Sequence, residues 1–443
     1  MDVLDFITLL IIMAAFFTLV NVRYLKLPST IGLMILALCL SLFIIFGELV
    51  FKTLNTLAQD LMTKYNFSEV LFKVMLSFLL FAGAIEMDLR KLKEEKWVIG
   101  ILAVFGTLIS TFVVGYAMYF LLPLVNIHLE LIHCLLFGAL ISPTDPIAVL
   151  AMIKKSHVSK NLESQIAGES LFNDGIGVVV FLTILSIAFP KGGLAEAQVS
   201  ALHVAELFGV EVVGGILLGA AIGYVGRWLL VIIDNEHTEI EVLVTLSMVL
   251  GGASLAEMLH VSMPLATVVM GIFVGEKGRG EETDPIAGEY VYKFWSLMDE
   301  AMNAILFILI GLQVIVINWE IGFFVAAGIA ILIVLSARFI GVSIPITIMR
   351  TRKKMPKYTI RILTWSGLRG GISVALALSL YDTAKEFSVN PRIIDLIISM
   401  TYSVVLFSIV VQGLTVGKLF AKANPEGDGK SDSPQKGEIA DHT

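Results

Sequence analysis

The sequence predicts an all-α polytopic membrane protein with about 13 transmembrane helices. Of its 443 residues, 57% are hydrophobic and only 16% are charged. Apolar stretches long enough to cross a bilayer recur from residue 3 to residue 416. Two of these stretches are interrupted at their middle, one by prolines and one by glycines. Such paired interruptions predict two inverted six-helix repeats whose broken helices cross.

Hydropathy along the chain places thirteen spans. They lie near residues 3–21, 28–48, 70–87, 97–121, 131–152, 163–189, 204–226, 240–258, 262–275, 291–318, 321–349, 359–381 and 393–416. The first span follows Asp2 and Asp5 and precedes Arg23 and Lys26, which is opposite to the charge order of a cleaved signal peptide. We therefore predict one transmembrane domain over residues 1–422.

The distribution of basic residues predicts the orientation of these spans. With the N-terminus outside, the inner loops carry 22 Lys and Arg residues and the outer loops carry 5. Positive charge gathers on the cytoplasmic side of membrane proteins. We expect an outside N-terminus and a cytoplasmic C-terminus in the plasma (inner) membrane. Residues 423–443 are polar and rich in Gly, Pro and Ser, which predicts a disordered cytoplasmic tail.

The composition excludes several classes of function. A GxxxxGK[ST] phosphate loop and a soluble domain are both absent from the sequence, which argues against an ATP-driven pump, a kinase or a receptor. Cys39 and Cys134 fall inside apolar spans, so they are predicted to be core residues rather than a disulfide or a metal site. We expect no enzymatic activity, no resident cofactor and no nucleic-acid partner.

The first interrupted span reads "GALISPTDPIAVLAM", residues 138–152. Pro143 and Pro146 remove two backbone donors, so carbonyls one turn earlier lose their partners and need protein, water or an ion beside them. Asp145 before Pro146 predicts the N-cap of a second half-helix. The first half-helix ends near Ser142 with its negative dipole end facing the break, which outlines a cation site. The alternative is a proline kink whose Asp only caps a helix.

The second interrupted span reads "ILTWSGLRGGISVALALSL", residues 362–380, with three glycines around Arg369. It lies seven spans after the first, and an odd offset inverts the second repeat relative to the first. Between them, the sixth span contributes "GESLFNDG", residues 168–175. An unpaired ionised acid near the bilayer centre costs about 2.5–3.5 kcal/mol, so the acids of this span are expected to face a cavity or a partner.

The spacing of these acids suggests how their charges are balanced. Ser170 and Asp174 are four residues apart, as are Glu169 and Asn173, so each pair lies on one helix stripe. If Arg369 neutralises Glu169, then Asp174 and Asp145 face one another and resist simultaneous ionisation unless a cation arrives. A proton and a small cation would compete for these oxygens, which gives exchange if the carrier changes its facing only when loaded.

These residues have different expected roles. A structural ion pair of Glu169 and Arg369 is favoured over a ligand role for either. Asn173 is favoured as a hydrogen-bonding brace rather than a ligand, and Asp174 as an ion ligand. Asp299 and Glu300 are expected to form a solvated wall, and Arg338 is expected to pair within the protein with a partner that the sequence does not identify.

Five motifs in order give the chain a family resemblance. "LLFAGAIEMDLRKL", "ISPTDP", "GESLFNDG", "FILIGL" and "WSGLRGGISVALAL" together resemble the monovalent cation:proton antiporter family, in its NhaP/NHE sodium/proton exchanger branch, over about residues 5–416. The resemblance implies an NhaA/NhaP-like homodimer with elevator-like alternating access. Each protomer would have a core bundle, placed around spans 70–189 and 291–416, and a dimerisation bundle from the remaining spans.

The resemblance also implies roles for individual residues. Asp174 would be the essential carboxylate, with Asp145, Ser170 and the backbone carbonyl of Thr144 as further Na+ ligands. Glu86 would contribute through water, with Asp88 as the alternative two residues away. Glu169 and Arg369 resemble the structural ion pair of the family. The supporting residues of the site are Asn173, Pro143, Pro146, Gly370 and Gly371.

The expected function is electroneutral exchange of Na+ or Li+ for H+ in pH homeostasis. The Asn-Asp sequence at 173 and 174 resembles the electroneutral branch, which implies one cation for one proton. A K+/H+ antiporter of the same family is the main alternative. A passive cation channel is a further alternative, since broken helices suit both. An intramembrane aspartyl protease is disfavoured because the sequence lacks a GxGD-like motif.

Overall fold

The computed structural model describes residues 3–47, 74–153, 159–189, 201–233, 238–277, 285–317, 319–351, 355–356, 358–387 and 389–423. Every named element in these ranges is a helix, as the predicted fold class requires. The predicted tail lies outside the described residues, apart from residue 423.

The helices follow the hydrophobic spans. They are α1 (Val3–Val20), α2 (Ser29–Phe46), α5 (Leu76–Ile85), α6 (Leu89–Ile101), α7 (Thr107–Leu121), α8 (Leu131–Ile141), α9 (Ile147–Ile153), α10 (Lys160–Ala188), α11 (Ala201–Ile232), α12 (Thr238–Met258), α13 (Met263–Lys277), α14 (Pro285–Leu312), α15 (Ile321–Met349), α16 (Thr359–Trp365), α17 (Gly371–Phe387), α18 (Pro391–Phe407) and α19 (Gly413–Ala423). Short π-helical turns join α6 to α7 and α18 to α19.

The number of apolar helical segments agrees with the thirteen predicted spans. Nine described stretches are long and apolar enough to cross a membrane, and four shorter apolar helices lie within α5, α8, α13 and α17. Several boundaries differ from the predicted spans by six to eight residues, and the largest difference is at the fourth span. The fourth span begins at Leu89 rather than near residue 97, because Asp88 caps α6 by accepting a hydrogen bond from the Arg90 amide at 3.0 Å. The charged first turns of α6 are helical although their composition is not apolar.

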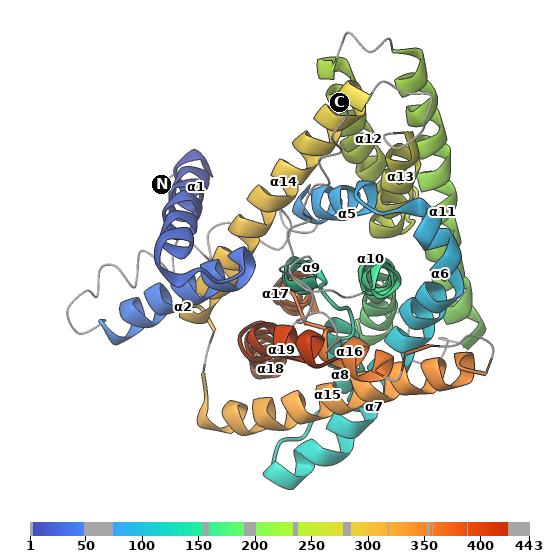
Figure 1. Cartoon of the computed structure of the whole chain (residues 1–443). Coiled ribbons are helices and arrows are strands. Elements are labelled where there is room, and N and C mark those ends of the chain that lie inside the picture. Colours follow the sequence, from blue (N-terminus) through green and yellow to red (C-terminus); the bar gives the residue numbers. More distant parts are fainter. Residues whose placement is uncertain are drawn as a thin grey trace, which may run out of the picture.

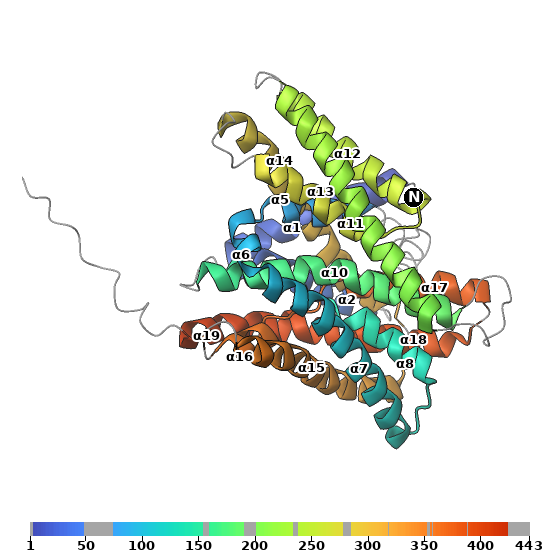
Figure 2. The same ribbon diagram turned by 90° about the vertical axis from the view of Figure 1, so that its right-hand side faces the viewer.

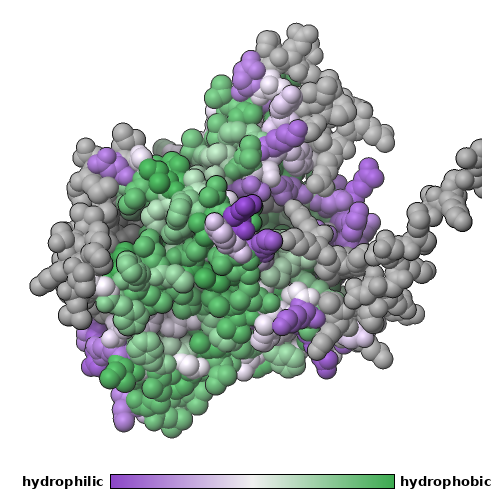
Figure 3. Space-filling model, turned by 60° about the vertical axis from the view of Figure 1, so that its left-hand side comes forward, coloured by the Kyte–Doolittle hydropathy of each residue, from purple (hydrophilic) through white to green (hydrophobic). Residues whose placement is uncertain are grey.

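The helix α10 lies inside the bundle, whereas α1 and α11 lie at its outside. Within the apolar window of each helix, 61% of α10 is buried, compared with 22% of α1 and 17% of α11. Figure 1 shows α10 nearly end-on, and it contacts α6, α8, α9, α11 and α13. One face of the molecule is broadly hydrophobic with hydrophilic residues at its margins (Figure 3). This distribution suits an integral membrane protein, since apolar side chains can face lipid.

Among the described residues, three clusters of buried hydrophobic side chains hold the helices together. The largest joins α7, α8, α10, α15, α17 and α18. Figure 2 shows α10 and the α18–α19 helix running in nearly the same direction, while α7 slopes across them. A second cluster surrounds Trp295 of α14 and joins it to α5, α12 and α13. A third joins α1 and α2 to α14. The helix α14 therefore connects the outer helices to those around the centre.

Two unwound segments cross at the centre of the largest cluster. One separates α8 from α9, and the other separates α16 from α17. Where they meet, the backbone amide of Asp145 donates to the carbonyl of Leu368 at 2.8 Å, in an antiparallel pairing. The two segments thus run in opposite directions, as inverted repeats require. The predicted crossing of two broken helices is confirmed.

Candidate functional site

The first unwound segment ends one half-helix and starts another. The Asp145 carboxylate accepts a hydrogen bond from the Ile147 amide at 2.9 Å, so Asp145 caps α9 as predicted. On the other side, the Ser142 hydroxyl donates to the Gly138 carbonyl at 2.6 Å and lies 2.9 Å from the Thr111 hydroxyl. The two half-helix ends that face the break are thereby held by hydrogen bonds.

Arg369, in the second unwound segment, crosses to the first. It is only 2% exposed, and its guanidinium donates to the Ser142 carbonyl and, at 2.9 Å, to the Pro143 carbonyl. These are the carbonyls at the negative end of α8 that the sequence analysis expected to face a transported cation. That expectation is corrected, because a fixed guanidinium already occupies them.

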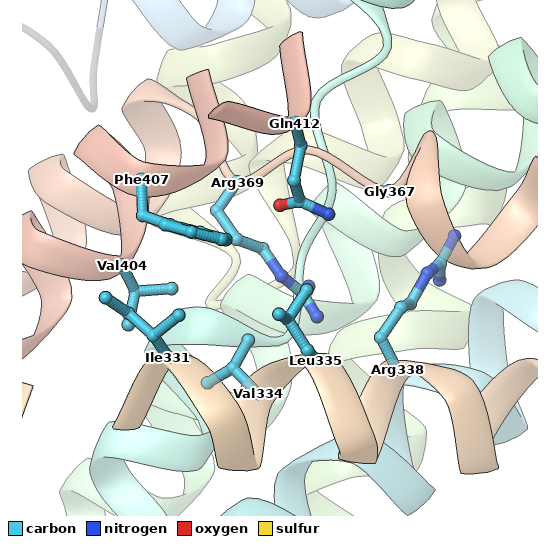
Figure 4. A pocket seen from close by; sticks show the side chains of 9 residues that line it. All are labelled: Ile331, Val334, Leu335, Arg338, Gly367, Arg369, Val404, Phe407 and Gln412. Carbon is cyan, nitrogen blue, oxygen red and sulfur yellow. The ribbon is translucent and has the colours of Figure 1, made fainter. Parts of the chain in front are cut away.

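The predicted ion pair between Glu169 and Arg369 is also wrong. Glu169 is paired instead with Arg338 of α15, through two hydrogen bonds of 2.6 and 2.7 Å, and both side chains are buried. Figure 4 shows that Arg338 rises from the ribbon of α15, whereas Arg369 comes from the unwound segment beside Gly367. The two arginines therefore have different tasks, one binding a carboxylate and the other binding carbonyls.

The partner of Arg338 was missed because Arg338 lies in an uninterrupted span. Its signal in the sequence was present: a single Arg inside the 29-residue apolar helix α15 requires a buried counter-charge. The Arg338 guanidinium also donates to the Leu363 carbonyl of α16 at 3.1 Å. Arg338 therefore connects α10 to the half-helix that precedes the second break.

Asn173 links Glu169 to the first unwound segment. Its amide nitrogen donates to the Glu169 carboxylate at 2.9 Å and to the Thr144 hydroxyl at 2.8 Å, and its amide oxygen accepts from the Thr144 backbone amide at 3.2 Å. The Ser170 hydroxyl lies 3.1 Å from the Thr144 hydroxyl. All four residues are buried. Asn173 thus has the contacts of a brace that positions Thr144 against α10.

Asp174 lies on α10 one turn after Ser170. It is 7% exposed, and within the described part of the chain its carboxylate has no hydrogen bond or ion pair. The carboxylates of Asp145 and Glu169 are close enough to repel it. Since Glu169 is neutralised by Arg338, Asp174 and Asp145 form a pair of neighbouring acids for which the described residues supply no fixed counter-charge.

Two glycines allow close packing at the crossing, one against Asp145 and one against Pro143. A Cβ at Gly370 would overlap the Asp145 carboxylate, lying 2.7 Å from its Cγ. A Cβ at Gly177 of α10 would overlap the Pro143 ring. Pro146 immediately precedes α9, and Gly371 is the first residue of α17. Glycine at positions 370 and 177 is therefore required for the close packing of the crossing.

Glu86 and Asp88 have different positions at the end of α5. Glu86 is the exposed C-cap of α5 and lies close enough to Asp299 of α14 to repel it. Asp88 caps α6. Of the two acids, Glu86 is the one that lies beside another acid of the bundle, while the capping bond of Asp88 gives it a structural role.

Two further polar residues support the second break and were not identified in the sequence. Ser408 accepts a hydrogen bond from the Arg369 backbone amide at 2.8 Å and donates to the Gln412 amide oxygen at 2.6 Å. The Gln412 amide nitrogen reaches the Trp365 carbonyl at 3.4 Å. Both belong to the π-helical turn Ser408–Gln412, and a π-turn has no reliable sequence signal.

The arrangement offers hard oxygen donors in a protein-enclosed position. Carboxylate oxygens come from Asp174 and Asp145, and a hydroxyl comes from Ser170. The Thr144 carbonyl accepts no hydrogen bond from the described residues, so its lone pairs are available. Carboxylate, hydroxyl and carbonyl oxygens are donors that replace the hydration shell of a monovalent cation. The same carboxylates can instead take up a proton.

Comparisons with known proteins agree with this geometry. Residues 11–422 match the family model described as "Sodium/hydrogen exchanger, transmembrane". The chain is 45% identical to the Na+/H+ antiporter NhaP of Pseudomonas aeruginosa, over 94% of this chain and 96% of the relative. It is 31% identical to the Na+/H+ antiporter NhaH of Halobacillus dabanensis, over 94% of this chain and 97% of the relative.

A solved structure has the same fold. The sodium proton antiporter MjNhaP1 of Methanocaldococcus jannaschii at pH 8 superposes with a TM-score of 0.74 and 19% identity, over 95% of this chain and 98% of that chain. These relatives are transporters rather than enzymes, which confirms the prediction that the chain is not an enzyme. The length and strength of the family match show that this chain belongs to the sodium/hydrogen exchanger family.

Proposed function

We propose that this chain exchanges Na+ or Li+ for H+ by alternating access, with one cation and one proton competing for Asp174 and Asp145. The observation that carries the proposal is the buried Asp174 carboxylate, which lacks a partner among the described residues and lies beside a second carboxylate. A buried acid without a counter-charge is costly in a membrane unless a ligand supplies the charge. Family membership supports Na+ and H+ as the substrates.

The remaining residues of the site have supporting roles in this proposal. Ser170 and the Thr144 carbonyl complete the oxygen shell of the cation, and Glu86 acts through water. Asn173 and the pair of Glu169 with Arg338 hold the shell in place. Because Arg369 already satisfies the end of α8, the transported ion has to balance the two carboxylates and not the helix dipole.

The cycle needs a carrier that changes its facing when loaded with either ion. We propose that it does so as a homodimer in the plasma (inner) membrane with an outside N-terminus and a cytoplasmic C-terminus. The division into a core bundle and a dimerisation bundle remains a prediction. Exchange of one cation for one proton is electroneutral, and a role in pH homeostasis follows. A K+/H+ antiporter remains the second candidate, because selectivity depends on the geometry of the oxygen shell.

The proposal is tested in proteoliposomes that carry an imposed pH gradient. Addition of Na+ or Li+ is expected to dissipate the gradient for the native protein and for Glu163→Gln, which removes another carboxylate of α10. Asp174→Asn, which keeps the size of the side chain, is expected to abolish exchange. Full exchange by Asp174→Asn would exclude the proposed site.

The same vesicles separate exchange from a channel and Na+ from K+. Electroneutral exchange is expected to produce no net current and to keep its rate when the membrane voltage is clamped at zero. Large single-molecule currents would identify a passive pore instead. A gradient dissipated by K+ but not by Na+ would establish the K+/H+ alternative.

A further inference from the structure

One face of α14 carries two polar residues and leads toward the crossing. It is not part of the site described above. Asp299, Asn303 and Leu306 follow one another at spacings of four and three residues, so they lie on one face of the helix. Leu306 packs against Gly371, where a Cβ would lie 2.5 Å from the nearest atom of the Leu306 side chain. One end of this face therefore touches the first residue of α17 at the second break.

Asn303 is an unsatisfied amide inside the protein. It is 3% exposed, and neither its amide oxygen nor its amide nitrogen has a hydrogen-bond partner among the described residues. A buried polar group left without a partner costs about 1–3 kcal/mol. An ion or a water molecule that binds transiently to the amide would offset this free-energy cost.

Asp299, one turn before Asn303, is half-buried and surrounded by other acids. The carboxylates of Glu86, Asp145 and Glu300 are all close enough to repel it. The Asn303 side chain faces the Asp299 carboxylate and interacts with it, although the contact falls short of full hydrogen-bond geometry. Asp299 is therefore near both Glu86, at the end of α5, and Asp145, at the crossing.

We propose that Asp299 and Asn303 form an approach position for the transported monovalent cation, ahead of the Asp145 and Asp174 site. The Asp299 carboxylate supplies charge, and the Asn303 amide oxygen supplies a neutral ligand that has no partner in the protein. Passage along a series of weak sites requires that each binds well enough to admit the ion and weakly enough to release it. This inference rests on the proposed exchange of cations at Asp174.

A purely electrostatic role of these acids would have a different consequence. If the acids of α14 only create a negative potential that attracts cations, every carboxylate contributes to that potential according to its charge. Glu300 would then be equivalent to Asp299. Glu300 is adjacent in sequence, carries the same charge and is exposed. Glu300→Gln is therefore a matched control for Asp299→Asn.

The experiment measures the dependence of exchange on Na+ concentration in proteoliposomes. Asp299→Asn is expected to raise the KM for Na+ about tenfold, equivalent to about 1.4 kcal/mol of binding, with the maximal rate within about twofold of the native value. Asn303→Leu is expected to raise the KM by a smaller factor, and Glu300→Gln to leave it unchanged. A KM shift for Asp299→Asn no larger than that of Glu300→Gln would overturn the proposal.

A charge-relocation variant excludes a merely structural explanation. In the double variant Asp299→Asn with Asn303→Asp, the carboxylate moves one turn along the same face, and most of the native KM is expected to return. Failure of the double variant to recover would overturn the proposal. Absence of exchange in the native protein would instead overturn the proposed function, so the two failures are distinguishable.

Discussion

The two unwound segments at the crossing occupy equivalent places in the two repeats, yet their chemistry is opposite. The segment between α8 and α9 contains two prolines and Asp145, and its acid caps the following half-helix. The segment between α16 and α17 contains glycines and Arg369, whose guanidinium reaches across to the carbonyls of the first segment. The first break therefore presents carbonyl and carboxylate acceptors. The second supplies the arginine that binds two of the carbonyls.

This difference separates fixed charge from exchangeable charge. In this structure the Arg369 guanidinium binds carbonyls at the negative end of α8, and the Arg338 guanidinium neutralises Glu169. Asp145 and Asp174 are left without a fixed counter-charge among the described residues. If the negative end of α8 depended on the transported ion, the protein would be less stable whenever the site was empty. Here the ion has to balance only the two carboxylates, which a proton can also neutralise.

The largest expected effect concerns the ion pair that connects the two breaks. Through Asn173, Glu169 holds the first segment, and through the Leu363 carbonyl, Arg338 holds α16. Arg338→Met is expected to lower the free energy of unfolding by about 3–5 kcal/mol, because Glu169 is left buried without a counter-charge. Unfolding in mixed micelles measures this, and the double variant with Glu169→Gln should be more stable than the sum of the single effects by up to about 3 kcal/mol.

A second double-mutant cycle, between Glu169 and Arg369, is the control. Arg369 donates to carbonyls rather than to Glu169, but it is close enough to be attracted by the Glu169 charge, so the coupling between these two residues is expected to be smaller than that between Glu169 and Arg338. A coupling at Arg369 as large as that at Arg338 would show that the two arginines share one task. The distinction between the breaks would then be lost.

The next effect concerns the contact between the two segments. Gly370→Ala is expected to displace the Asp145 carboxylate, abolish exchange and lower the free energy of unfolding by about 1–3 kcal/mol through overpacking. Gly328→Ala on α15 is the matched control, because a Cβ there meets no atom within 4 Å. The control should exchange at the native rate and unfold at the native temperature or slightly above it. Native exchange rates in Gly370→Ala would contradict the proposed position of Asp145.

Local chemistry explains which parts of this site could be predicted from the sequence. Prolines and glycines in apolar spans mark breaks because they remove donors or tolerate close approach, and the N-cap role of Asp145 follows from Pro146 beside it. The contacts of the arginines could not be predicted in the same way. Arg338 meets a carboxylate 169 positions away, and Arg369 binds backbone carbonyls, which have no residue identity to recognise. The π-turn that presents Ser408 is likewise a product of packing.

The smallest expected effects compare one hydroxyl at each break. Thr111→Val removes a partner of the Ser142 hydroxyl, which keeps its bond to the Gly138 carbonyl. Ser408→Ala leaves the Arg369 backbone amide without an acceptor. Hydrogen bonds between membrane helices contribute about 0.6 kcal/mol on average and at most about 1.7 kcal/mol, so both variants should fold. Ser408→Ala is expected to cost more stability and to slow exchange, because the orphaned amide loosens the segment that carries Arg369. If Thr111→Val were the more damaging variant in unfolding and exchange assays, the first break and not the second would need the firmer support.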